Sequence, residues 1–208
     1  LEVTFPKPEE RELRRSDFFK ERLGTNQSTN GSWVYYHWDH CLIHILNDLD
    51  LFSLRTNRNR ELVTIEEENK IKDFNIGIAG LSIGSNLASA LSHLGARNFK
   101  LADFDKLATS NLNRVSATLL DLEKNKAVLI AERIYETDPY SKIEIFEEGI
   151  NNDNLTEFLV GSKKLDVIVD SIDDFEMKIR LRQLARENGT PVLMFTNLGD
   201  STLVDIER

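Results

Sequence analysis

The sequence predicts an α/β protein with a Rossmann-like, mostly parallel sheet, helices on both faces of that sheet, and a helical N-terminal extension. From Asp73 onward, short apolar runs typical of buried strands alternate with longer segments of helical periodicity. A turn that contains Gly80 and Gly84 follows the first of these runs, and an acidic residue, Asp103, follows the second. Strands and helices that alternate in this way form parallel sheets with right-handed crossovers.

Composition narrows the class of protein. The 208 residues are 40% hydrophobic and 29% charged, which is ordinary for a globular protein with a full core. The net charge of -9 disfavours nucleic acid as a partner, because most of the surface would repel its phosphates. ATP remains compatible with this charge, since a few local cations and backbone N–H groups are enough to hold phosphates.

Cysteine content and hydropathy indicate the compartment. Cys41 is the only cysteine, so neither an intrachain disulfide nor a Cys-x-x-Cys zinc pair is possible. No run approaches the ~18 apolar residues of a membrane span, and the start at Leu1 does not resemble a signal peptide. We therefore predict a cytoplasmic protein without a membrane partner. The missing initiator Met and the abrupt end at Arg208 predict a fragment of a longer chain.

Two parts are expected: an N-terminal extension over residues 1–70 that forms an interface, and a nucleotide-binding domain over residues 71–208, truncated at its C-terminus. Within the extension, Trp33 to Phe52 is aromatic and then apolar, with a spacing that predicts a helix. Three histidines, at positions 37, 40 and 44, would then share one helix face. A packed or interface helix is the preferred interpretation there, and a metal site is the alternative.

The elements of the domain follow in order from hydrophobic periodicity. A short capped helix is expected from Thr64 to Lys72. The predicted strands are Phe74–Ala79, Phe99–Ala102, Ile143–Phe146, Leu165–Val169 and Val192–Thr196. The predicted helices are Ser85–Leu94, Leu122–Glu136, Leu155–Val160 and Phe175–Asn188. Ligands of such sheets bind outside the carboxyl ends of the strands, so we expect a site near Ala79, Ala102 and Val169.

The turn after the first strand is suited to a phosphate. Gly80 allows a tight turn, and Gly84 allows the start of the next helix to pack closely. The N-terminus of that helix offers unpaired N–H groups to an anion. Laid on the dinucleotide pattern Gly-x-Gly-x-x-Gly, the turn keeps only the last glycine, so a tight turn that binds nothing is the alternative.

Polar residues after the second strand add to the predicted site. Asp103 lies 23 residues after Gly80, where a carboxylate can accept hydrogen bonds from ribose hydroxyls. Asp105 is either a ligand residue or a loop cap. Next come Asn111, Arg114, Lys124 and Lys126, which could reach a triphosphate. A solvated helix face is the better interpretation for Lys124, and a phosphate contact for Arg114.

These segments resemble the ATP-using adenylyltransferase family of ThiF, MoeB and the ubiquitin-activating enzymes. Leu101-Ala-Asp-Phe-Asp105 followed by Ser110-Asn-Leu-Asn-Arg114 is similar to the family's Asp-x-Asp…Ser-Asn-Leu-x-Arg segment. Lys126-Ala127 resembles its Lys-Ala pair, and the stretch from Asp166 to Phe175 resembles its Asp-x-x-Asp-Asn pattern. The similarity extends from about Arg58 to Asp205.

The resemblance implies the roles of individual residues with ATP and Mg²⁺. The backbone from Gly80 to Gly84 would approach the nucleotide, with Ser82 where the family has glycine. Asp103 would hold the ribose. The phosphate contacts would come from Asn111, Arg114 and Lys126. Asp173 would hold Mg²⁺ with Asp170 as support; capping the helix that begins near Phe175 is its alternative role.

The resemblance also implies a reaction and an assembly. The family activates a carboxylate, such as the C-terminus of a small ubiquitin-like or sulfur-carrier protein, by letting it attack the α-phosphate of ATP. Arg114, Lys126 and Asp173 would be the catalytic residues, with an Arg from an Asn-Arg pair of the partner subunit. Asn57-Arg58 and Asn59-Arg60 both fit, and Arg60 is slightly favoured. We therefore predict a homodimer; a monomer whose first seventy residues fold back is the alternative.

Departures from the family pattern keep a second function open. Ala79, Leu81 and Ser82 replace residues that are usually glycine, and Leu81 is expected to crowd the phosphates. The family's zinc and catalytic cysteines are missing, which resembles a bacterial subgroup with a ThiF-like domain before a nitroreductase-like domain. A non-catalytic nucleotide-binding or dimerisation module that regulates a fused domain is thus the alternative to an adenylyltransferase. An NAD-dependent oxidoreductase is disfavoured by the cations.

Overall fold

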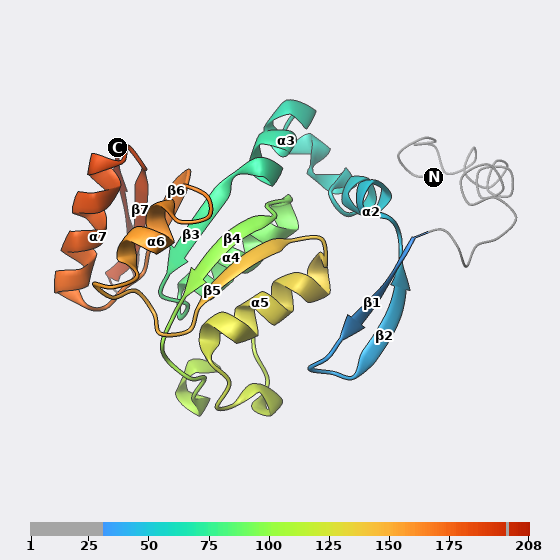
Figure 1. The fold of residues 1–208 in the computed structure, drawn as a ribbon, viewed down its shortest axis with the longest axis horizontal. Coiled ribbons are helices and arrows are strands. Elements are labelled where there is room, and N and C mark those ends of the chain that lie inside the picture. The colour runs from blue at the N-terminus through green and yellow to red at the C-terminus, as the bar shows by residue number, and fades with distance from the viewer. Residues whose placement is uncertain (1–30, 199) are drawn as a thin grey trace, which may run out of the picture. The chain divides into compact units, whose positions relative to one another are not determined.

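The computed structural model describes residues 31–198 and 200–208 (Figure 1). The chain divides after Ile65 into two compact units. Within the described residues, no helix has the length and the apolar character needed to cross a bilayer.

The N-terminal unit contains a β-hairpin instead of the helix expected from Trp33. Strands β1 (Ser32–Tyr36) and β2 (Cys41–Ile45) pair antiparallel, and His40 has a positive φ of 50° in the turn that joins them. Aromatic and β-branched side chains favour paired strands over a helix, which explains why the expectation was wrong. Helix α2 (Asp48–Arg55) follows and begins with a cap, because the Asn47 side chain accepts a hydrogen bond from the Asp50 amide.

The hairpin also separates the three histidines. His37 and His40 lie in the turn, while His44 lies in β2 with its ring centroid 4.7 Å from that of Trp33. They do not share a helix face, and no group of three His, Cys, Asp or Glu residues in the described part of the chain is arranged to hold a metal ion. A short 3₁₀ helix, Asn57–Glu61, contains both candidate Asn-Arg pairs.

The C-terminal unit is built on a six-stranded sheet with the order β5-β4-β3-β6-β7-β8 (Figure 1). Five strands run parallel: β3 (Asn75–Ala79), β4 (Asn98–Ala102), β5 (Lys142–Phe146), β6 (Val167–Asp170) and β7 (Val192–Leu198). The last strand, β8 (Ser201–Glu207), pairs antiparallel with β7 and was not expected. The helices are α3 (Ile65–Asp73), α4 (Gly84–Leu94), α5 (Lys126–Thr137), α6 (Leu155–Val160) and α7 (Phe175–Glu187).

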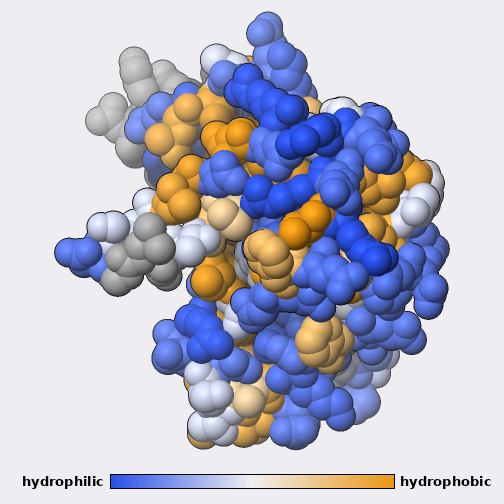
Figure 2. Space-filling view, turned by 90° about the vertical axis from the view of Figure 1, so that its left-hand side faces the viewer, coloured by the Kyte–Doolittle hydropathy of each residue, from blue (hydrophilic) through white to orange (hydrophobic). Residues whose placement is uncertain are grey.

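Helices cover both faces of this sheet, as predicted. One core cluster joins α4 and α5 to the sheet through residues such as Ala88 and Leu129, and a second joins α6 and α7 through Phe158 and Leu181. Helix α7 buries Met177, Leu181 and Ala185 on one side. The molecule seen from the α7 side is mostly hydrophilic (Figure 2). The Rossmann-like fold is therefore confirmed, with the apolar side chains of α4, α5, α6 and α7 packed against the sheet.

Two helix boundaries have clear local causes. Helix α4 ends at Gly95, whose φ of 117° and amide bonds to the Leu91 and Ser92 carbonyls form a left-handed cap. Helix α5 begins at Lys126 and not at the expected Leu122, because the Asn125 side chain accepts from the two amides that follow Lys126.

Candidate functional site

A cavity of about 250 Å³ lies at the carboxyl ends of β3, β4 and β6. This edge is the topological switch point of the sheet. The chain continues from β3 to β4 and β5 on one side of β3, and then to β6 and β7 on the other side. Most of the predicted site residues line the cavity: Gly80, Ser82, Asp103, Asp105, Asn111, Arg114, Lys126 and Asp173. Gly84 packs beneath the turn and does not line it. Arg60 belongs to the N-terminal unit, and its role stays a prediction.

The first turn approaches the cavity with bare backbone. Gly80 has a φ of 89°, and a Cβ atom there would lie 2.3 Å from the Ser171 carbonyl oxygen. At Gly84 a Cβ would lie 2.8 Å from Cγ2 of Ile78, so this glycine allows α4 to pack on the sheet. Both glycines therefore have the structural roles that their positions predicted.

Leu81 does not crowd the cavity. Its side chain is fully buried in the core cluster of α4 and α5, and it is not among the lining residues. Its amide donates a hydrogen bond of 2.6 Å to Oδ2 of Asp103. The expectation that Leu81 obstructs the site is therefore wrong, because the turn directs this side chain into the protein.

Asp103 is a buried carboxylate that holds two loops. Besides the Leu81 amide, it accepts a hydrogen bond of 2.8 Å from the Asp105 amide at Oδ1. Burial raises the pKa of Asp103, because desolvation outweighs the stabilisation from these two amides and from the charge of Lys126. Each oxygen keeps a lone pair for a further donor, which is what a ribose hydroxyl would require.

Asp105 forms an ion pair with Lys126. The two atoms, Nζ and Oδ2, are 2.8 Å apart, and the Lys126 amide also donates to the Asp105 carbonyl at 2.9 Å. Asp105 thus fixes the first residue of α5 through both its main chain and its side chain. Sequence reasoning left Asp105 as a ligand residue or a loop cap and did not find this pairing.

The segment from Ser110 to Arg114 places a cation beside the turn. Asn111 is buried, and its side chain accepts from the Ala108 amide at 2.9 Å, which stabilises the 3₁₀ helix Thr109–Asn111. Arg114 donates from Nε to Oγ of Ser82 at 3.1 Å. Asn111 therefore shapes the loop, and Arg114 is the cation next to the glycine turn.

The three aspartates after β6 have different roles. Asp174 caps α7 by accepting from the Met177 amide at 3.1 Å, so the cap that was considered for Asp173 belongs to its neighbour. Asp170 is fully buried between Lys178 at 3.1 Å and Arg182 at 3.2 Å. Asp173 is exposed to solvent, lines the cavity and has no hydrogen bond or ion pair within residues 31–198 and 200–208.

Several lining residues were missed by sequence reasoning: Phe104, Gly149, Ile150, Ser171, Ile172 and Met177. Phe104 is 72% exposed, and a Cβ at Gly149 would lie 2.9 Å from its ring. The signal was available, since Gly149 and Ile150 come shortly after the third predicted strand and Phe104 lies between two aspartates. Phe104, Ile150, Ile172 and Met177 add apolar surface to a cavity whose other lining residues are mostly polar or charged.

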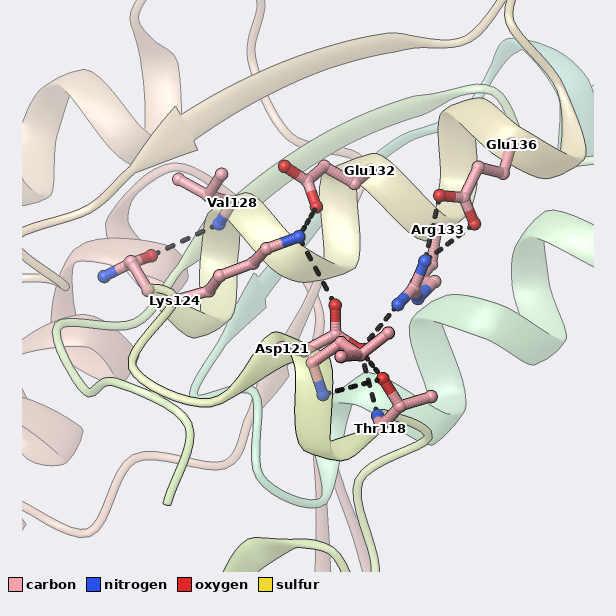
Figure 3. A network of polar contacts seen from close by, with 9 residues as sticks. Thr118, Asp121, Lys124, Val128, Glu132, Arg133 and Glu136 are labelled. Atoms are coloured by element: carbon pink, nitrogen blue, oxygen red, sulfur yellow. Dashed lines mark hydrogen bonds and ion pairs between the residues drawn. The ribbon is translucent and has the colours of Figure 1, made fainter. Parts of the chain in front are cut away.

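A polar network holds the loop between Arg114 and Lys126 (Figure 3). Asp121 accepts from the amide and the hydroxyl of Thr118, both at 2.9 Å, and from Arg133 at 2.7 Å. Lys124 bridges Asp121 at 3.3 Å and Glu132 at 2.9 Å. Burial alone would raise the pKa of Asp121, but the Thr118 hydrogen bonds and the nearby cations lower it to about 2. Lys124 thus stabilises the loop and does not line the cavity.

Fold and site together define the class: a doubly wound α/β domain with its cavity at the switch point. The ThiF family model matches residues 55–201, well over half of the chain, and the chain therefore belongs to the ThiF family.

The chain is also similar to parts of several known proteins. The uncharacterized protein MT1398 of Mycobacterium tuberculosis is 41% identical over 177 residues, which are 85% of this chain and 24% of that protein. The tRNA threonylcarbamoyladenosine dehydratase of Escherichia coli is 29% identical over 119 residues, 57% of this chain and 43% of that enzyme. A crystal structure of E. coli tRNA N6-threonylcarbamoyladenosine dehydratase in complex with ATP has a TM-score of 0.65 at 24% identity, covering 72% of this chain and 61% of that one. The chain spans less than half the length of both curated relatives.

Proposed function

We propose that the C-terminal unit binds ATP with Mg²⁺ and adenylates a carboxylate. One observation carries this proposal: the cavity is lined by two cations, Arg114 and Lys126, and by a carboxylate, Asp173, that has no partner in the described part of the chain. A triphosphate with a divalent metal requires both kinds of side chain. A dinucleotide used for hydride transfer has less need of these cations and needs no metal.

The backbone of the first turn fits a phosphate group. Gly80 brings the main chain to the cavity without a Cβ. Helix α4 begins just beyond, and its N-cap residue, Ile83, has no side chain that accepts from the first amides. An uncapped helix N-terminus beside Arg114 provides both the N–H groups and the positive charge that phosphate oxygens bind.

Asp173 fits a magnesium site. Its loop is fixed on both sides, since the Ile172 amide donates to Asp170 at 3.2 Å and Asp174 caps α7. Mg²⁺ is usually held by one or two carboxylates, with the other ligands supplied by substrate phosphates and water. One carboxylate that lines the cavity and has no partner among the described residues, as Asp173 does, therefore meets this requirement.

Adenylation requires positioning and charge, and no nucleophile from the protein. ATP supplies the α-phosphate as the electrophile. A carboxylate oxygen of the acceptor forms a bond to that phosphorus while the bond to pyrophosphate breaks, so pyrophosphate leaves and an acyl-adenylate remains. Arg114 and Lys126 offset the negative charge that develops, and Asp103 orients the ribose. The acceptor we propose is the C-terminus of a small ubiquitin-like or sulfur-carrier protein, or of a peptide.

Pyrophosphate exchange tests this function. Labelled pyrophosphate should enter ATP only when a suitable acceptor carboxylate is present, and Arg114→Ala should abolish the exchange. Calorimetry should show that ATP binds more tightly than NAD. Tighter binding of NAD would contradict the proposal.

A regulatory nucleotide-binding module is the second candidate. It is favoured by the turn, where Ala79, Leu81 and Ser82 occupy positions that are usually glycine in the resembled family. ATP binding without exchange for any acceptor peptide would support this function over adenylation.

A further inference from the structure

The side chain of Arg114 is held at three points by its own protein. Its Nε donates to Oγ of Ser82 at 3.1 Å, and its Nη1 donates to the Ser110 carbonyl at 3.2 Å and to Oδ1 of Asn113 at 2.9 Å. The Ser110 and Asn113 bonds are local to the loop that carries Arg114. The bond to Ser82 is the one that connects the guanidinium to the glycine turn.

Ser82 is itself fixed in that turn. Its carbonyl accepts a hydrogen bond of 2.8 Å from the Ser85 hydroxyl, and the preceding Leu81 is anchored in the core and by Asp103. The Oγ atom uses one lone pair to accept from Arg114. Its own O–H proton has no acceptor among the hydrogen bonds of the described residues, so this proton is available at the cavity that Ser82 lines.

The main chain of Arg114 is also connected to α4. The side-chain amide of Asn86, in the first turn of this helix, donates to the Arg114 carbonyl at 2.9 Å. The cation and the positive end of the helix are therefore held next to each other by Ser82 and Asn86. Groups of like polarity repel, and an anion placed between them relieves that repulsion.

We propose that Ser82 is a positioning residue for Arg114 and, through its hydroxyl proton, a hydrogen-bond donor to the same phosphate group. The inference rests on the proposed nucleotide binding and adds to it a role for this side chain. A glycine at position 82 would leave the turn intact, but it would remove both the acceptor that holds Nε and the donor to the phosphate. Compared with glycine, Ser82 makes the turn less flexible, and its side chain holds the Arg114 guanidinium in place.

Affinity for nucleotides with and without phosphates tests the role. In the 208-residue chain, Ser82→Ala and Ser82→Gly should each weaken ATP binding by about 10-fold or more, as expected for a lost hydrogen bond to a charged group. Adenosine binding should stay unchanged, because the proposed role of Ser82 concerns the phosphates alone. Ser82→Thr keeps the hydroxyl and should restore most of the ATP affinity. Ser89→Ala, a serine of α4 that does not line the cavity, is the matched control.

A double-mutant cycle with Arg114→Ala separates positioning from turn formation. If Ser82 acts through Arg114, part of the Ser82→Ala loss should disappear in the Arg114→Ala background. Equal losses in both backgrounds, or a parallel loss of adenosine and ATP affinity, would overturn the inference. A wild-type chain that binds adenosine but gains nothing from its phosphates would instead overturn the proposed function. Thermal unfolding of each variant identifies any that fail to fold, and Ser82→Gly remains as the variant with the least disturbed turn.

Discussion

Nζ of Lys126 lies 2.8 Å from Oδ2 of Asp105, and the two side chains differ sharply in exposure: 4% for the lysine and 54% for the aspartate. A buried ammonium group requires a compensating charge, and Asp105 provides it from the solvent side. The pair therefore lets α5 present a cation at a place where water is largely excluded.

Asp105→Ala should lower the free energy of unfolding by about 1–2 kcal/mol, because Lys126 would remain buried without its partner. Adding Lys126→Met should recover most of that loss while abolishing ATP binding. Urea unfolding and calorimetry measure the two effects. If Asp105→Ala unfolds at the wild-type urea concentration, the pair contributes nothing to stability.

Asp121 should make the loop between Arg114 and Lys126 sensitive to acid. Its folded pKa of about 2 is below the ordinary aspartate value, so its contribution is complete above pH ~4 and is lost as the pH falls toward 2. The shift corresponds to about 2 kcal/mol. Asp121→Asn should be destabilised by about that amount at pH 7 and should approach wild-type stability near pH 2. A difference that stays constant across this range would exclude the ionised carboxylate as the cause. Glu136→Gln, at the exposed end of the same network, is the control.

Substitutions at Asp173 and Asp174 should affect different properties, magnesium binding at the first position and helix capping at the second. Asp173→Asn should weaken magnesium-dependent ATP binding and leave thermal stability unchanged, since this side chain has no partner in the structure of residues 31–198 and 200–208. Asp174→Asn keeps a capping group, whereas Asp174→Ala should cost about 1 kcal/mol of stability through the lost cap. Normal Mg-ATP binding by Asp173→Asn would remove this residue from the metal site.

The chain should form a homodimer in which the Arg60 side chain serves the nucleotide of the neighbouring subunit. Sedimentation at micromolar concentration tests the assembly. Arg60→Ala and Lys126→Ala chains, each inactive alone, should regain part of the exchange activity when mixed, because one of the two sites then has both residues. No recovery from a demonstrably mixed dimer would place Arg60 in its own subunit's site or in none. Arg58→Ala in the same experiment decides between the two Asn-Arg pairs.

The amino-acid sequence alone predicts the parallel sheet, the helices on its faces, and the edge at which the cavity lies. Those features depend on local periodicity and on glycines such as Gly80, whose backbone conformation is encoded at the position itself. It also placed Asp103, Arg114 and Asp173 together, since the carboxyl ends of parallel strands meet at one edge. The partner of each side chain became visible in the folded structure: Lys126 for Asp105, the α7 amide for Asp174, Ser82 for Arg114, and a second strand for Trp33 to Tyr36. These are pairings between segments distant along the chain or between alternatives of similar local preference, and they are selected by burial and hydrogen bonding that no short window of sequence contains.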